Sequence, residues 1–232
     1  MNRRLVLFDI DGTLLLTAGA GRRAIRAALL EWLPDDALFE RVRFDGKTDP
    51  QIVAELLAEG GEPDPMEPGR IAEVCTRYVA ALEVELTGSA ARTQLLPGVA
   101  PLLERLESEY GVVLGLLTGN VARGAELKLR AAGLEPARFQ LGAFGSDSAH
   151  RPDLPAVAAG RAHAWFGRPP HGEEVVIIGD TPADVTCGQA IGARAIGVAT
   201  GSYGVDDLRS AGARAAFETL ESLDRVVDAI LA

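Results

Sequence analysis

Two aspartates stand two residues apart at the end of a short apolar run near the beginning of the chain. The run covers residues 5–8, Asp9 and Asp11 follow it, and Gly12 and Thr13 come next. Such a run is typical of a strand that is buried on both faces of a parallel sheet. Two carboxylates at one strand end repel each other unless a cation lies between them or one is protonated. Asp9 and Asp11 are therefore candidates for a metal site with acid–base chemistry. The alternative is a pair of solvated turn aspartates.

Three further predicted strands also lead into polar residues. These are Thr118, Gly119 and Asn120 after residues 112–117, Arg151 in the loop after residues 139–144, and Asp180 and Asp184 after residues 175–178. The carboxyl ends of parallel strands lie at one edge of a sheet, where such folds bind their ligands. Acid, hydroxyl, amide and cation are thus expected to meet at one edge.

Each of these residues also has a purely structural interpretation. The turn at 118–120 could cap a helix, and Arg151 could be a solvated loop cation. Asp180 could cap the helix that begins near Pro182, with Asp184 as an exposed acid of its first turn. It is the coincidence of all these groups at the expected strand ends that favours a functional site.

This set of residues can transfer a phosphoryl group, a reaction that needs positioning and charge neutralisation more than elaborate covalent chemistry. Mg²⁺ prefers a few carboxylates, so Asp9, Asp11 and Asp180 are suitable ligands. One carboxylate could attack phosphorus to give an aspartyl-phosphate, while the other protonates the leaving oxygen and then activates water. Thr118 would hold phosphate oxygens, and Arg151 would offset their charge.

Strands and helices alternate over most of the chain, which predicts an α/β fold with a doubly wound, Rossmann-like parallel sheet. A fifth strand is expected at 195–198, and helices at 98–109, 122–132, 154–166 and 220–231. Between residues 17 and 92 the pattern is helical throughout. Helices are expected there at 19–33, where Pro34 stops the pattern, at 51–57 and at 70–86. No glycine-rich dinucleotide fingerprint or GxxxxGK[ST] loop follows any strand.

The composition limits the possible partners. The 232 residues contain 47% hydrophobic residues without a long apolar run, which argues against a membrane span. The net charge of −10 disfavours nucleic acid as a partner, although a small anionic substrate is possible at a metal site. With only two cysteines, no CxxC pattern and no signal-peptide pattern, a cytoplasmic protein with reduced thiols is expected.

The motif set resembles that of the haloacid dehalogenase superfamily, in particular its phosphoglycolate-phosphatase-like branch. The resemblance is carried, over the whole chain, by Asp9-Ile10-Asp11-Gly12-Thr13, Thr118-Gly119-Asn120, a basic residue before residue 175, and Gly179-Asp180-Thr181-Pro182-Ala183-Asp184. It implies a core of residues 1–16 and 93–232 and a helical cap of residues 17–92.

The resemblance also implies roles for individual residues. Asp9 would be the nucleophile and Asp11 the general acid and base. Mg²⁺ would be held by Asp9, Asp180 and the backbone carbonyl of Asp11, with Asp184 orienting metal-bound water. The phosphate would be bound by Thr118, with Gly12, Thr13, Gly119 and Asn120 among the substrate-binding residues.

Two basic residues, Arg151 and Lys47, are further candidates for the site. The third motif of the family is usually a lysine, but no lysine follows Lys128 in this chain. Arg151 is the best replacement, although a planar fork differs from a point charge, and Arg161 is a weaker candidate. Lys47 lies in the cap segment Gly46-Lys47-Thr48-Asp49 and could reach the substrate when the cap closes. A solvated turn lysine is the alternative.

The expected activity is Mg²⁺-dependent hydrolysis of a small phosphorylated metabolite, resembling phosphoglycolate or a sugar phosphate, by a monomer or homodimer. Asp11 argues against dehalogenase and phosphonate-cleaving relatives, because both lack an acid at that position. A phosphomutase, a phosphonate or pyrophosphate hydrolase and a non-catalytic phospho-accepting module remain as alternatives, the phosphonate reaction because Lys47 lies in the cap.

Overall fold

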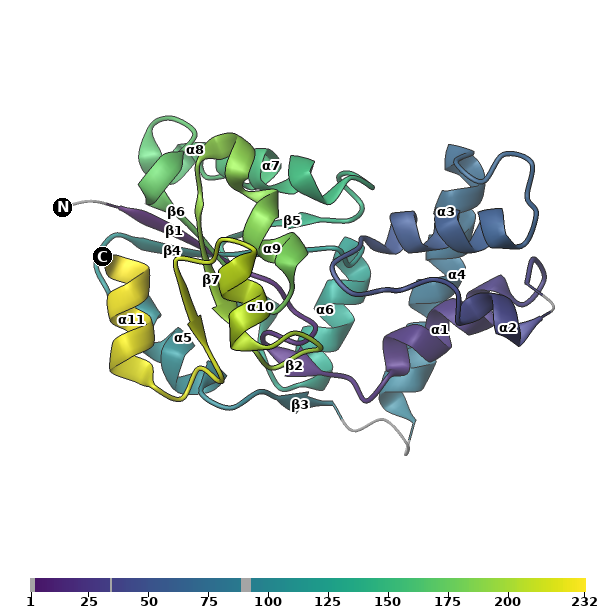
Figure 1. Ribbon diagram of the computed structural model, residues 1–232, viewed down its shortest axis with the longest axis horizontal. Helices are drawn as coiled ribbons and strands as arrows, with labels where there is room; N and C mark the ends of the chain where they lie inside the picture. Colours follow the sequence, from purple (N-terminus) through teal and green to yellow (C-terminus); the bar gives the residue numbers. More distant parts are fainter. Residues whose placement is uncertain (1–2, 34, 89–92) are drawn as a thin grey trace.

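A six-stranded parallel sheet forms the centre of the computed structural model, which describes residues 3–33, 35–88 and 93–232 (Figure 1). The strand order is β5-β4-β1-β6-β7-β8. The strands are β1 (Arg4–Phe8), β4 (Val112–Thr118), β5 (Leu141–Phe144), β6 (Val175–Gly179), β7 (Arg194–Val198) and β8 (Ala215–Phe217). Because β1 pairs with both β4 and β6, the residues that follow these three strands lie side by side.

Helices cover both faces of this sheet, as the buried apolar strands require. They are α5 (Val99–Glu107), α6 (Ala122–Ala131), α7 (Leu154–Arg161), α8 (His163–Phe166), α9 (Pro182–Cys187), α10 (Val205–Ser210) and α11 (Leu223–Leu231). Val6 and Phe8 of β1 pack in one hydrophobic cluster with α5, α6 and α11. Leu5 and Leu7 point to the opposite face and pack against α7. The doubly wound α/β prediction is therefore confirmed.

The cap is helical and lies to one side of the sheet (Figure 1). It contains α1 (Ala20–Leu29), α2 (Asp36–Phe39), α3 (Asp49–Glu59) and α4 (Pro68–Thr87), which share a hydrophobic cluster around Tyr78 and Leu82. A short antiparallel ribbon of β2 (Leu15–Leu16) and β3 (Gln94–Leu95) joins it to the core. The domain boundaries at 16/17 and 92/93 stay predictions, and Arg92 and Pro34 lie outside the described residues.

Several details differ from the sequence predictions. The strand expected from residue 139 begins at 141, because residues 136–138 form a 3-10 turn. The helix expected at 154–166 is divided at Ala162 into α7 and α8, and the last helix begins at 223 rather than 220. The predictions did not include β8, α10 or the ribbon. Among the described residues, no helix has both the length and the apolar character needed to cross a membrane.

Candidate active site

Three aspartates that are distant in sequence form a buried cluster at the carboxyl edge of the sheet. Asp9 follows β1, Asp180 follows β6, and Asp184 lies in α9. Each is at most 6% exposed, and one carboxylate oxygen from each lies within 4.8 Å of the others. The predicted convergence of these acids is thus what the structure shows.

Arg151 lies against two of these carboxylates, in a buried position. Its Nη2 donates a 3.0 Å hydrogen bond to Oδ1 of Asp9 and also contacts Oδ1 of Asp184. The interpretation of Arg151 as a solvated loop cation is therefore wrong, since the residue is 5% exposed. The weaker candidate Arg161 instead pairs with Asp147.

Asp184 takes part both in the start of α9 and in the acid cluster. Its Oδ2 accepts hydrogen bonds from the backbone N–H and the hydroxyl of Thr181, which forms a capping box at the start of α9. Its Oδ1 accepts from Arg151. The expected exposure of Asp184 is wrong, and Thr181 rather than Asp180 caps the helix.

The carboxylate of Asp180 lies close to the backbone of two glycines, Gly12 and Gly201. The Thr13 hydroxyl donates to its Oδ1 at 3.2 Å. A Cβ on Gly12 would lie 2.4 Å from Oδ2 of Asp180, and one on Gly201 would lie 1.8 Å from it. Gly12, with φ of +81°, thus allows both the turn and the approach of the carboxylate. Gly12 and Thr13 pack on Asp180 and are not among the residues that line the cavity between cap and core.

The carboxylates of the cluster carry more negative charge than the surrounding protein neutralises. Burial, with the neighbouring charge of Asp184, raises the pKa of Asp9 to about 7. The same two causes, with Asp9, raise the pKa of Asp180 to about 9. One guanidinium contacts two of the three carboxylates, so a hard divalent cation such as Mg²⁺ fits this donor set in both charge and ligand type.

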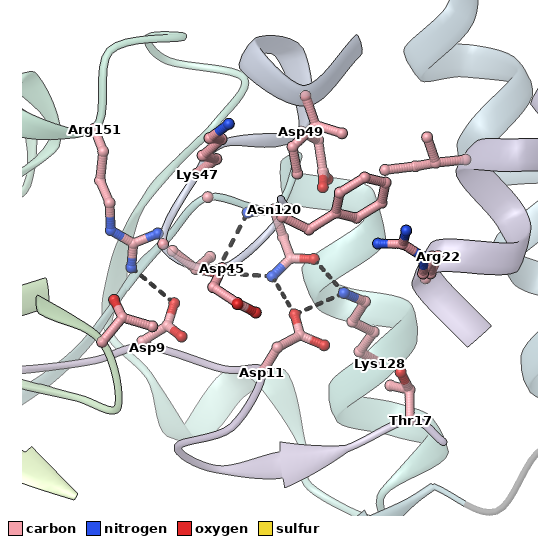
Figure 2. A pocket seen from close by; sticks show the side chains of 18 of the residues that line it. Asp9, Asp11, Thr17, Arg22, Asp45, Lys47, Asp49, Asn120, Lys128 and Arg151 are labelled. Carbon is pink, nitrogen blue, oxygen red and sulfur yellow. Dashed lines mark hydrogen bonds and ion pairs between the residues drawn. The ribbon is translucent and has the colours of Figure 1, made fainter. Parts of the chain in front are cut away.

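Asp11 lies apart from the acid cluster, and its carboxylate is held by a different cation. Its Oδ2 accepts a 2.6 Å hydrogen bond from Lys128 Nζ and a 2.8 Å bond from Asn120 Nδ2 (Figure 2). The sequence prediction of site residues did not include Lys128. The sequence feature that could have identified Lys128 is its place on the buried face of α6, with Ala125 and Leu129, where a lysine is unusual.

The turn after β4 is organised by Thr118 and Asn120. Thr118 is fully buried, and its Oγ1 accepts from the Nδ2 of Asn120 at 2.8 Å. The helix-capping interpretation is wrong, because α6 has Val121 at its N-cap and no side-chain cap. The amide of Asn120 instead donates a hydrogen bond to Asp11 of the site.

A loop of the cap docks directly on this turn. The backbone N–H of Asp49 donates to the carbonyl of Gly119 at 2.7 Å, and the N–H of Val121 donates to Asp49 Oδ2 at 2.8 Å. A Cβ on Gly119 would lie only 2.1 Å from the carbonyl oxygen of Lys47. Burial raises the pKa of Asp49 to about 6. Lys47 is paired with Glu55 on α3, so it is not a free turn lysine.

A cavity of about 230 Å³ lies between cap and core. The predicted site residues that line it are Asp9, Asp11, Lys47, Thr118, Gly119, Asn120, Arg151 and Asp180. The lining residues that the sequence prediction missed include Arg22, whose guanidinium stacks 4.6 Å from the Phe44 ring, and Tyr78. Both lie on cap helices, where single residues carry no motif.

The chain is similar to known proteins in both sequence and fold. The family "haloacid dehalogenase-like hydrolase" matches residues 6–189. A curated protein of Dickeya dadantii (strain 3937), named probable phosphatase IndB, is 27% identical over 98% of this chain and 94% of its own length.

Solved structures share the fold. A hydrolase from Pseudomonas syringae is 23% identical with a TM-score of 0.70, covering 97% of this chain and 98% of its own. CbbY from Rhodobacter sphaeroides, solved in complex with phosphate, is 23% identical with a TM-score of 0.71, covering 95% and 96%.

Proposed function

Because the chain belongs to the haloacid dehalogenase-like hydrolase family, we propose that it is a Mg²⁺-dependent phosphatase acting on a small phosphorylated metabolite. The observation that carries the proposal is the unequal surroundings of Asp9 and Asp11. Asp9 is buried against Arg151 in the acid cluster, whereas the side chain of Asp11 is 42% exposed and held by Lys128. Two carboxylates in unlike surroundings are suited to two different roles.

In the proposed reaction, a carboxylate oxygen of Asp9 attacks phosphorus and the bond to the leaving oxygen breaks. Asp11 donates a proton to that oxygen, leaving a phosphoryl group on Asp9. Asp11 then takes a proton from a water molecule that attacks phosphorus, which releases inorganic phosphate and restores Asp9. Thr118 and Arg151 offer a hydroxyl and a guanidinium to the phosphoryl oxygens.

Asp9 and Asp180 would hold Mg²⁺, with the backbone carbonyl of Asp11, and Asp184 would support the set from α9. When bound, the ion neutralises phosphoryl charge as a Lewis acid. The acid cluster and its excess negative charge support this assignment. The small cavity and the covering cap support a small substrate such as phosphoglycolate or a sugar phosphate. The two free cysteines support a cytoplasmic location.

Release of phosphate from 4-nitrophenyl phosphate tests this proposal. We expect turnover with Mg²⁺, none after EDTA treatment, and loss of turnover in Asp9→Asn. An inactive parent protein, or an Asp9→Asn variant as active as the parent, would remove the phosphatase assignment. A screen of phosphorylated metabolites ranked by kcat/KM would then identify the substrate.

A further inference from the structure

Lys128 is a buried lysine of α6 whose ammonium group contacts the carboxylate of Asp11 and the side-chain amide of Asn120. It is 4% exposed. Its Nζ lies 2.6 Å from Oδ2 of Asp11 and 2.5 Å from Oδ1 of Asn120. The Nδ2 of Asn120 donates to the same Asp11 oxygen at 2.8 Å, which closes a triangle of three side chains (Figure 2).

This triangle fixes the orientation of each of its members. Asn120 uses its carbonyl for Lys128 and its amide for Asp11 and Thr118, so a flipped amide would lose all three contacts. Oδ2 of Asp11 accepts two hydrogen bonds, one of them charge-assisted, which prevents free rotation of the carboxylate. No hydrogen bond to Oδ1 of Asp11 occurs within the described part of the chain.

The cap covers the ammonium group of Lys128. A Cβ on Gly21 of α1 would lie 3.4 Å from Nζ, at van der Waals distance, so this cap helix passes close to the ammonium group. Burying an ammonium group is costly unless it is paired and hydrogen-bonded. Lys128 stands on the buried stripe of α6, where an apolar residue would pack without that cost.

We propose that Lys128 is a positioning residue that, with Asn120, holds Oδ2 of Asp11 and leaves Oδ1 as the oxygen that exchanges the proton with the substrate. This inference rests on the proposed function, in which Asp11 is the general acid. It assigns a different cation to each of the two aspartates. Arg151 serves Asp9, and Lys128 serves Asp11.

The leaving group of the substrate separates this role from a structural one. An alkyl oxygen needs a proton to leave, whereas 4-nitrophenolate leaves with little help. The value of kcat/KM reports the steps up to loss of the leaving group, before water enters. We expect Lys128→Met to lower kcat/KM about 100-fold for glycerol phosphate and less than about 10-fold for 4-nitrophenyl phosphate. Asp11→Asn should show the same selective loss.

Two further variants complete the experiment. Arg130→Met removes an exposed cation from the same helix and should leave both values unchanged. Asn120→Ala, which removes the second contact to Asp11, should reproduce the selective loss to a smaller extent and replaces Lys128→Met if that variant does not fold. Equal losses on the two substrates, or no loss, would overturn the positioning role. Turnover by the parent protein tests the proposed function separately.

Discussion

Arg151 donates a 3.0 Å hydrogen bond to the carboxylate of Asp9 from a position 142 residues away in the chain. The loop after β5 brings the guanidinium beside Asp9 at the end of β1. Because one guanidinium nitrogen also contacts Asp184, a single residue links the proposed nucleophile to the acid of α9. That Arg151 takes the place of the third-motif lysine stays a prediction, which its contacts to both acids support.

Removing this cation should damage both activity and stability. Arg151→Met leaves Asp9 and Asp184 buried without their partner, so we expect kcat to fall by about 10² to 10³ and the free energy of unfolding to fall by about 3–5 kcal/mol. Arg151→Lys keeps the charge but loses the planar fork, and should show a smaller loss of both. Steady-state kinetics and urea denaturation measure the two effects. A lysine variant no better than the methionine variant would contradict the argument from charge.

The metal-free protein should lose stability as the pH rises. An unfolded aspartate titrates near about 3.9, whereas the folded pKa is about 7 for Asp9 and about 9 for Asp180. Above pH 4 the unfolded chain therefore releases protons that the folded chain retains. The stability contributed by these protonated groups is fully present below about pH 4 and is lost as the pH rises through the two folded values.

Thermal unfolding in EDTA at pH 6 and pH 9 checks this expectation. We expect a lower Tm at pH 9, and a rise in Tm on adding Mg²⁺ that is larger at pH 9, where protons no longer compete for the carboxylates. Asp180→Asn should flatten the dependence on pH. A metal-free Tm that increases between pH 6 and pH 9 would show that these pKa values are not raised.

Lys47 should contribute more to substrate binding than to catalysis. Its side chain is 26% exposed, lines the cavity and is paired with Glu55, so it is held near the substrate by a cap helix. We expect Lys47→Ala to raise KM about 10-fold with a smaller change in kcat, as measured with the best substrate of the screen. Arg41→Ala, which removes an exposed cation of the cap paired with Glu59, is the matched control. An unchanged KM in Lys47→Ala would remove this assignment.

The sequence predicted five of the six strands and the acidic edge of the sheet, because both depend on local patterns. Each predicted strand is an apolar run, and Asp9 and Asp180 directly follow such strands. Lys128 was not predicted as a site residue, because its contact with Asp11 depends on how α6 packs against the turn after β1. No local sequence pattern encodes this packing. The two-residue strands of the ribbon are too short to show a periodicity, and their paired residues are 78 and 80 positions apart in the sequence.

The hydroxyl of Tyr78 should weaken the fold rather than support it. The residue is fully buried on α4, and its hydroxyl has no hydrogen-bond partner within the described residues. An unsatisfied buried polar group costs about 1–3 kcal/mol, so Tyr78→Phe should raise the free energy of unfolding by about 1 kcal/mol. Tyr110→Phe, at a position 80% exposed, should change it by less than about 0.5 kcal/mol. A destabilised Tyr78→Phe variant would indicate that the hydroxyl has a partner.

Gly119 should be essential for docking of the cap loop. A Cβ at this position would meet the carbonyl oxygen of Lys47 at 2.1 Å and Cα of Thr48 at 2.9 Å, both of them backbone atoms that cannot rotate away. Gly119→Ala should therefore break the Asp49–Gly119 hydrogen bond and lower the free energy of unfolding by about 1–3 kcal/mol. It should also reduce kcat/KM, because the displaced loop carries Lys47.

Gly160→Ala provides the matched control for Gly119. Gly160 is exposed on α7, and a Cβ at this position would have no atom within 4 Å. Alanine should therefore stabilise the helix by about 0.5–1 kcal/mol without changing kcat/KM. Urea denaturation and steady-state kinetics of both variants make the comparison. If Gly119→Ala retained the stability and kcat/KM of the parent, the cap loop would have to shift readily away from the turn after β4, and its hydrogen bonds to that turn would contribute little to the site.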